Sequence, residues 1–305
     1  MATIDPHKRS SLSLDVAKDA ITPGEVFFVN NSGVGPIGML VASDNNTGKS
    51  QLEPLATIAG AQAKCKDGRG DIVYFMPGHA ETISAVLALS VAGVSYIGVH
   101  PKGLRPVFTG KVADDLFNIT GANVKIENFI FGAPLTTAQA SFINVAAAGV
   151  VIKNVKGIGS VASQVMVDCI DIAAGGDDCT IDGVEFWNTV GAITNFINIE
   201  AAVKRLTLKN IFCFGDVSGV GIVDGATALQ MYWENIRVKV VGTTKHAATL
   251  SNNSTGLISN AYFAGTDATL ANNAALGTGV VLFDVRLVKE TDGSKQGAQI
   301  PAVDA

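Results

Sequence analysis

The chain has few charged and few aromatic side chains. Only 16% of its 305 residues are charged and 7% are aromatic, whereas 48% are hydrophobic. A chain with this balance buries a substantial core, which excludes disorder for most of its length. The formal net charge of -5 provides no basic surface for a phosphate backbone, so we expect no nucleic-acid partner.

The sequence also lacks the segments that carry a protein into or across a membrane. Its first residues, MATIDPHKRSSLSLD, contain no apolar core of a secretory signal, which predicts synthesis in the cytoplasm. Two charge-free stretches, 83–99 and 132–152, are interrupted by glycine or by polar residues. They favour buried strands over membrane spans, so we expect no membrane partner.

Recognisable cofactor and metal motifs are missing as well. The four cysteines form no C-x-x-C pair and have no nearby histidine at metal spacing, which favours reduced core thiols and leaves a Cys169–Cys179 disulfide as an alternative. His79 and His100 could bind a metal together with Glu81, but a structural role at a turn is favoured. We therefore predict no cofactor and no metal site.

What the chain does have is a repeated strand with a residue that strands usually exclude. VKIENFIF, LTLKNIFCF and MYWENIRV each carry an Asn at the same place, and eight positions align on it at spacings of 24 to 30 residues. Every one is Gly, Asn or Asp, the residues that tolerate positive φ, which predicts a left-handed corner between two short strands. The predicted turn ladder is Gly98, Asn128, Asn154, Gly183, Asn210, Asn235, Asn260 and Asp284.

The residues around each corner follow one pattern. Apolar residues stand two before and one after it, and the residue directly before it alternates in charge. That alternating row is Glu127, Lys153, Asp182, Lys209 and Glu234. In a parallel stack such residues lie in line about 4.8 Å apart, where opposite charges attract weakly. A second short strand precedes each corner and places Asn118, Asn144, Asp171 or Asn198 between two inward apolar residues.

A period of this length, with several short strands and no helix-length segment, predicts an all-β, single-stranded parallel β-helix of roughly eight to nine coils. We expect an N-terminal arm over 1–24, a cap with the first strands over 25–70, the β-helix over 71–287 and a polar tail over 288–305. The segment Pro54–Cys65 predicts a short capping helix.

Two stretches carry a resemblance to a known group of proteins. GDIVYFMPGHAETIS (Gly70–Ser84) and AGVSYIGVHPKGLRPVFTG (Ala92–Gly110), with FFVNN, SDNNTGKS and PLATI before them, resemble right-handed β-helix proteins of tailed bacteriophages, within the pectate-lyase-like fold. The resemblance implies a right-handed β-helix and a structural component of a virion. Such proteins are often homotrimers, and some resemble capsid decoration proteins.

The candidate catalytic acids favour geometric roles. β-Helix enzymes that act on acidic glycans gather carboxylates on the outer face of one sheet, but the row Asn118, Asn144, Asp171 and Asn198 holds one acid among amides. Asp177 and Asp178 lie in a glycine-rich turn, and Asp182 with Glu185 lies in or beside the charge row. No cluster suits the Ca²⁺ of a pectate-type lyase. We therefore predict that the chain is not an enzyme.

The main functional hypothesis is a non-enzymatic capsid decoration protein. Its expected partners are further copies of itself in a homotrimer and the major capsid protein or other virion proteins, and its expected location is the virion. Apolar residues at outward positions, Ile97, Val151 and Phe283, suggest a contact surface. Two alternatives stay open: a tailspike-like glycan depolymerase, and a glycan binder without catalysis.

Overall fold

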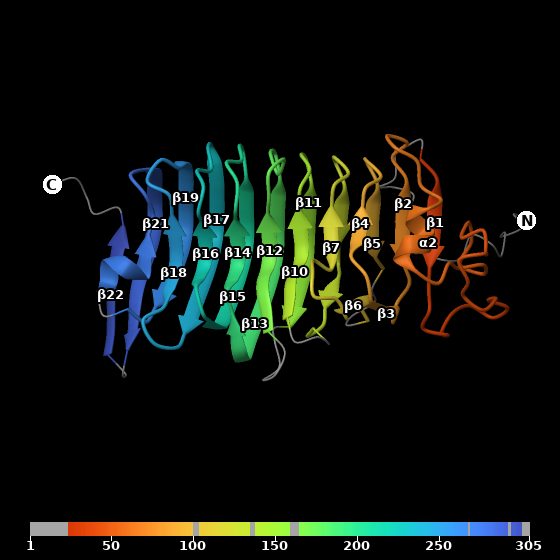
Figure 1. Cartoon of the computed structure of the whole chain (residues 1–305), viewed down its shortest axis with the longest axis horizontal. Coiled ribbons are helices and arrows are strands. Elements are labelled where there is room, and N and C mark those ends of the chain that lie inside the picture. Colours follow the sequence, from red (N-terminus) through yellow and green to blue (C-terminus); the bar gives the residue numbers. More distant parts are fainter. Residues whose placement is uncertain are drawn as a thin grey trace, which may run out of the picture.

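The chain winds into a stack of parallel strands along one long axis. The computed structural model describes residues 24–99, 104–134, 138–158, 165–267, 269–291 and 294–300. Consecutive coils lie side by side from the N-terminal to the C-terminal end, as the colour gradient in Figure 1 shows. The fold is a right-handed parallel β-helix of about eight turns with almost no helix, as the sequence predicts.

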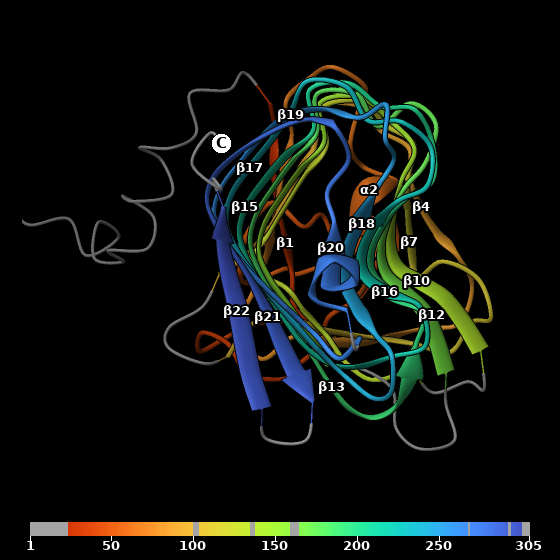
Figure 2. The ribbon, with the colours of Figure 1, turned by 90° about the vertical axis from the view of Figure 1, so that its left-hand side faces the viewer.

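Two sheets enclose the core, and the view along the axis in Figure 2 shows them on opposite sides of it. In the described residues the larger sheet has 14 strands and the smaller has eight. The larger sheet comprises β1 (Val26–Val29), β2 (Ile72–Phe75), β3 (Ala80–Ile83), β5 (Ser95–Gly98), β6 (Val107–Gly110), β8 (Lys125–Glu127), β9 (Ile130–Phe131), β11 (Val151–Ile158), β13 (Thr180–Ile193), β15 (Thr207–Val217), β17 (Met231–Val241), β19 (Thr255–Gly265), β21 (Gly279–Thr291) and β22 (Ser294–Ile300). The smaller sheet comprises β4 (Leu87–Leu89), β7 (Phe117–Ile119), β10 (Ala138–Val145), β12 (Val165–Ile172), β14 (Asn195–Ile199), β16 (Val220–Asp224), β18 (His246–Leu250) and β20 (Ala274–Ala275).

Seven of the eight predicted corner residues have positive φ. The values are 65° at Asn128, 51° at Asn154, 72° at Gly183, 52° at Asn210, 54° at Asn235, 49° at Asn260 and 48° at Asp284. From β11 to β21 one long strand runs through each corner, so the left-handed residue bends the strand without ending it. Neighbouring coils are in register on both sides of the bend.

Gly98 departs from this pattern and needs a correction. Its φ is not positive, and it is the last residue of β5. A Cβ at this position would lie 2.5 Å from the carbonyl oxygen of Asn128 and 2.7 Å from Cδ of Pro106. Glycine is therefore required at position 98 by the close approach of neighbouring backbone and side chain, and not by a left-handed conformation.

Amide side chains link several corners. Nδ2 of Asn235 donates to Oδ1 of Asn210 at 2.8 Å, and Nδ2 of Asn154 donates to Oδ1 of Asn128. Gly183 has no side chain to continue the row, and Nδ2 of Asn210 instead donates to Oδ1 of Asp182 at 2.7 Å. The corner residues thus supply both the conformation and part of the bonding between coils.

The predicted charge row forms. Lys153 lies opposite Glu127 on one side and Asp182 on the other, and Lys209 lies between Asp182 and Glu234. Nζ of Lys209 lies 3.4 Å from Oε2 of Glu234. These exposed pairs contribute little to stability, but they disfavour a shift in register.

The core between the sheets is apolar and filled in layers. Successive coils stack Ile143, Ile170, Ile197 and Ile222 on the smaller sheet, and all four are fully buried. Phe108 lies at the centre of an aromatic cluster, with ring centroids 4.8 Å from Phe129 and 5.1 Å from Phe117. All four cysteines are free and buried, as predicted.

Both ends of the stack carry extra elements. Helix α2 (Ile58–Gln62) lies inside the predicted capping segment, begins at the N-cap Thr57 and buries Ile58 and Ala61. At the other end the short 3-10 helix η2 (Leu270–Asn273) precedes β20, and β22 pairs antiparallel with β21. The predicted polar tail over 288–305 therefore contains the end of β21 and all of β22, while the predicted arm lies outside the described residues apart from position 24. None of the helices in the described ranges has the length and apolar character needed to span a bilayer.

Candidate catalytic site on the outer face of the smaller sheet

Two polar rows cross the outer face of four successive strands of the smaller sheet. Phe142 and Ile143 of β10 are both fully buried, so the strand bends between them and turns residues 141 and 144 toward the same outer side. The register repeats this arrangement on β12 and β14. The first row holds Ser141, Asp168 and Asn195, and Asp115, which lies just before β7, adjoins it by accepting a hydrogen bond from Ser141. The second row holds Asn118, Asn144, Asp171 and Asn198.

Asp168 is at the centre of the first row and is held by amides of the next coil. Nδ2 of Asn195 donates to its Oδ1 at 2.7 Å, and Nδ2 of Asn198 donates to its Oδ2 at 3.2 Å. The Asp168 residue is only 3% exposed. Burial raises the pKa of Asp168, while the hydrogen bonds from these amides oppose that rise.

Asp171 lies three residues further along β12 and is 8% exposed. Burial raises the pKa of its carboxyl group to about 8, and the neighbouring carboxylates of Asp168, Glu200 and Asp115 add to that rise. Its side chain is also hydrogen-bonded to Asp168. Two carboxyl groups in such contact cannot both ionise at low cost, so Asp171 holds a proton at neutral pH.

Two further acids flank this pair. Asp115 accepts from Oγ of Ser141 at 2.8 Å and from Nδ2 of Asn144 at 2.9 Å, so both of its oxygens are engaged. Glu200 follows β14 and is exposed to solvent, where it accepts from Nδ2 of Asn198 at 3.3 Å. The site thus contains a protonated acid, a held carboxylate and an exposed carboxylate on adjoining coils.

The second row also contains acceptors without donors. Oδ1 of Asn118, Oδ1 of Asn144 and Oδ1 of Asp171 are buried and have no hydrogen-bond partner in the described structure. They occur on three successive strands. An unpaired buried acceptor costs free energy, so this row gains from any hydroxyl or water donor that reaches it.

The sequence identified only part of this cluster. It placed Asp171 in the outward row but counted it as one acid among amides. Strict alternation along VMVDCIDI gives Asp168 the inward side, because it lies an even number of residues from Met166 and Ile170. The sequence of one coil does not reveal the bend that brings positions 168 and 171 to the same face. An alignment of successive coils, which places Ser141, Asp168 and Asn195 at equivalent positions, would have revealed the polar row.

The other candidate acids lie elsewhere and have structural partners. Asp178 forms an ion pair with Arg205 of the next coil, and Asp177 accepts from the backbone N–H of Lys204 at 2.8 Å. Asp182 belongs to the charge row, and Glu185 pairs with Lys156 at 3.1 Å.

The surroundings of His79 indicate a structural role. It is fully buried, its Nδ1 accepts from the backbone N–H of Asn31 at 3.2 Å, and its Nε2 lies 3.2 Å from Oε2 of Glu81. His100, its proposed companion, lies outside the described residues. Within the described ranges, no group of three or more His, Cys, Asp or Glu side chains is arranged to hold a metal ion.

Comparison with known proteins supports the fold. No protein-family model and no curated protein matches the sequence. Among solved structures, a rhamnogalacturonan lyase matches with a TM-score of 0.50 and 14% identity over 86% of this chain and 73% of its own. A pectate lyase matches with a TM-score of 0.47 and 13% identity over 88% and 76%, and the ORF18 protein of Geobacillus virus E2 with a TM-score of 0.27 and 10% identity over 97% and 67%. At 14% identity the likeness to the rhamnogalacturonan lyase shows the β-helix fold alone, a fold shared with polysaccharide-acting enzymes.

These findings correct the prediction that the chain is not an enzyme, which is wrong. The solved structure that matches with a TM-score of 0.50 is a protein named as a lyase. The prediction also depended on the lack of an acid cluster, whereas Asp168, Asp171, Asp115 and Glu200 form one on the outer face of the smaller sheet. The prediction was wrong because it counted only Asp171 among the acids on that face and missed Asp168.

Proposed function

We propose that the chain is a glycan-depolymerising protein that hydrolyses a polysaccharide on the outer face of its smaller sheet. The observation that carries the proposal is the carboxyl group of Asp171, whose pKa of about 8 keeps it protonated at neutral pH beside Asp168. A buried carboxyl group that retains its proton is the form that a general acid requires.

In this mechanism Asp171 gives its proton to the glycosidic oxygen as the bond to the leaving sugar breaks. Glu200 is the second carboxyl group, because it is exposed to solvent and accepts a hydrogen bond from the side-chain amide of Asn198. It accepts a proton from the water that attacks the anomeric carbon. Each sugar product ends with a hydroxyl group, and proton exchange with solvent restores both carboxyl groups.

The remaining polar side chains position these groups. Asn195 and Asn198 hold Asp168 as a fixed negative charge, which favours the positive charge that develops on the sugar ring. The partly exposed side chains of Asn118 and Asn144, at equivalent positions on neighbouring coils, suit the hydroxyl groups of a sugar chain. A row of side chains that repeats once per coil fits a chain of repeating sugars.

The test is the release of reducing ends from a panel of neutral and acidic polysaccharides. The substitutions D171N and E200Q are expected to lower the rate by about 10²- to 10⁴-fold, the usual contribution of general acid–base groups. D178N is the matched control, because Asp178 lies in the turn after β12 and pairs with Arg205 and not with the carboxyl cluster, and it should leave the rate unchanged. No release from any substrate, or an equal loss in D178N, overturns the proposal.

A homotrimeric assembly on a virion, with the capsid protein or other virion proteins as partners, stays a prediction. Val281 and Phe283 support a contact surface on β21, because their side chains are 66% and 65% exposed. Light scattering after size exclusion should give three copies for the native chain and fewer for F283E. Co-purification with phage particles tests the location. A monomer at all concentrations, or absence from particles, would contradict these two predictions.

A further inference from the structure

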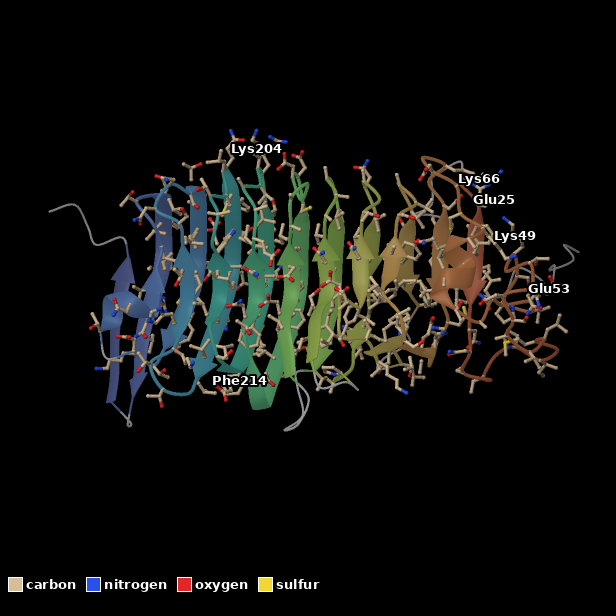
Figure 3. All side chains as sticks on the ribbon, viewed as in Figure 1. Glu25, Lys49, Glu53, Lys66, Lys204 and Phe214 are labelled. Carbon is tan, nitrogen blue, oxygen red and sulfur yellow. The ribbon has the colours of Figure 1, made fainter. Side chains whose placement is uncertain are left out.

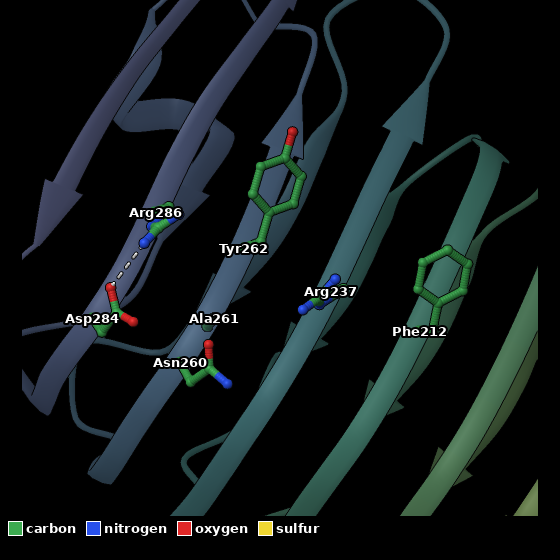
Figure 4. Close-up of a pocket in the computed structure, with 7 residues that line it drawn as sticks. All are labelled: Phe212, Arg237, Asn260, Ala261, Tyr262, Asp284 and Arg286. Atoms are coloured by element: carbon green, nitrogen blue, oxygen red, sulfur yellow. Dashed lines mark ion pairs between the residues drawn. The ribbon is translucent and has the colours of Figure 1, made fainter.

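A second site lies on the outer face of the larger sheet. Four outward residues occupy equivalent positions on four successive strands and alternate between aromatic and cationic side chains. In order from β15 to β21 they are Phe212, Arg237, Tyr262 and Arg286, as Figure 4 shows. The smaller sheet with its carboxyl cluster lies on the other side of the core.

These residues line a cavity of about 360 Å³, within the range of small-ligand sites. Asn260 and Asp284, two corner residues, form one edge of it. The alternation of side-chain types therefore coincides with a hollow in the surface. Phe212 is 38% exposed, so its ring is available for contact.

An aromatic cluster adjoins the cavity at β13 and β15. The ring centroid of Trp187 lies 5.6 Å from that of Phe212 and 5.3 Å from that of Phe214. Nε1 of Trp187 donates to Oε1 of Glu185 at 2.6 Å, which fixes the indole, and Nζ of Lys239 lies 5.7 Å from the centre of the Phe214 ring. Figure 3 places Phe214 at the lower edge of the molecule, away from Lys204 at the upper edge.

The two arginines differ in their surroundings. Nη2 of Arg286 lies 3.7 Å from Oδ1 of Asp284, so part of its charge is balanced. For the side chain of Arg237 the described residues provide no hydrogen bond and no ion pair. A guanidinium is a bidentate donor for carboxylate and sulfate groups, which makes Arg237 the strongest anion-binding group of the cavity.

We propose that this cavity binds an acidic polysaccharide whose chain lies along the long axis and crosses β15, β17, β19 and β21. The rings of Phe212 and Tyr262 stack against sugar faces, and Arg237 and Arg286 bind the carboxylates. Successive strands are about 4.8 Å apart. One sugar unit of an extended chain advances by a comparable distance, so aromatic and cationic groups alternate in step with the polymer. The two arginines are two strands apart, which matches acidic groups that face the same side on every second sugar.

The surrounding charges favour a polyuronate over a nucleic acid. Glu185 and Asp284 flank the cationic positions on the same face, and the whole chain has a net charge of -5. A phosphate backbone concentrates more negative charge along its length and would be repelled by these acids. The site lies away from the carboxyl cluster, so it would hold a polymer without cutting it.

The experiment measures binding of polygalacturonate oligosaccharides by titration calorimetry. All variants carry D171N, so that cleavage at the other face cannot consume the probe and binding does not depend on the proposed catalysis. R237Q and F212A are each expected to weaken binding by roughly tenfold or more, and R286Q less, because Asp284 already shares its charge. R205Q is the matched control, since it removes the same charge at a distant turn.

Each outcome decides the proposal. Binding that is lost with R237Q and F212A, kept with R205Q, absent for neutral dextran and weakened by salt supports it. No binding of polygalacturonate, or an equal loss in R205Q, overturns it. Equal affinity for single-stranded DNA also overturns it, because the surface would then select charge alone. Circular dichroism of each variant establishes that it is folded.

Discussion

The carboxyl groups of Asp171 and Asp168 lie three residues apart on β12, and the negative charge of Asp168 adds to the rise in the pKa of Asp171 that burial causes. Asp171 retains its proton, because burial and the negative charge of its neighbour keep it in place. The two groups therefore titrate as a coupled pair. This arrangement makes both the stability and the proposed activity of the protein depend on pH.

The first prediction is that the effect of D171N on thermal stability depends on pH. The ordinary pKa of an aspartic acid is about 4. An unfolded chain releases the Asp171 proton there, whereas the folded chain retains it up to a pKa of about 8. Between these values the unfolded state binds fewer protons, so the native protein loses stability as pH rises. D171N lacks this titration, and its melting temperature relative to the native protein should rise from pH 4 to pH 8. Thermal unfolding followed by circular dichroism measures the difference.

The control for this prediction is D178N, which should change stability in the opposite direction. The Arg205 guanidinium holds the pKa of Asp178 below its usual range, so its stabilising effect is present at neutral pH and lost as pH falls. D178N should therefore melt slightly below the native protein at neutral pH, and the difference should vanish in acid. A D171N effect that does not vary with pH would contradict the assigned protonation.

The second prediction concerns the corner amide of Asn210. Its side chain donates to Asp182 and accepts from Asn235, and its φ is 52°. Asn210→Gly keeps the left-handed backbone and loses only the two hydrogen bonds, at about 1 kcal/mol each. Asn210→Ala loses the same bonds but keeps a Cβ, which in that conformation costs about 1–2 kcal/mol relative to glycine. The urea midpoint of Asn210→Ala should therefore lie below that of Asn210→Gly.

Lys209→Ala is the matched control at the neighbouring position. Its partner Glu234 is exposed, and such surface pairs contribute about 0–1 kcal/mol. If Asn210→Gly and Asn210→Ala have the same midpoint, the left-handed conformation does not limit stability at this corner.

The parallel β-helix could be predicted because its physical requirements repeat in every coil. A left-handed corner accepts few residue types, and stacking forces outward charges such as Lys153 and Asp182 to alternate. The same residue types therefore recur in every coil, so the coils of a single sequence can be aligned with one another to find the pattern. The carboxyl site could not be predicted in this way, because it depends on a bend between Phe142 and Ile143 that changes which face Asp168 shares.

The capping helix illustrates the same limit at the end of the stack. Its position follows from apolar residues that must cover the open core, and α2 lies where the sequence places it. The strand β22 does not follow, because an antiparallel partner for β21 has no counterpart in the repeat. An element that occurs only once, such as β22, cannot be recognised from a repeated sequence pattern.

The third prediction concerns the cysteines. Burial raises the pKa of Cys65 to about 12 and that of Cys179 to about 11, and it raises the pKa of Cys169 and Cys213 as well. A thiol is reactive only as a thiolate, so none should react with a thiol reagent in the native protein at neutral pH. All four should react after unfolding in urea without reductant, since no disulfide joins them. Mass spectrometry counts the labels. Rapid labelling of a native cysteine would contradict the assigned burial.

The fourth prediction separates two reasons for glycine in this fold. At Gly98 a Cβ would come within 2.5 Å of the Asn128 carbonyl oxygen, although φ at this residue is not left-handed. Gly98→Ala should therefore destabilise the protein by about 1–3 kcal/mol through overpacking. At Gly225 no atom lies within 4 Å of an added Cβ and φ is not left-handed, so Gly225→Ala should be neutral or stabilise by about 0.4–1 kcal/mol. Urea unfolding of the two variants distinguishes them, and equal midpoints would mean that the coil around Gly98 relaxes to accommodate the methyl group.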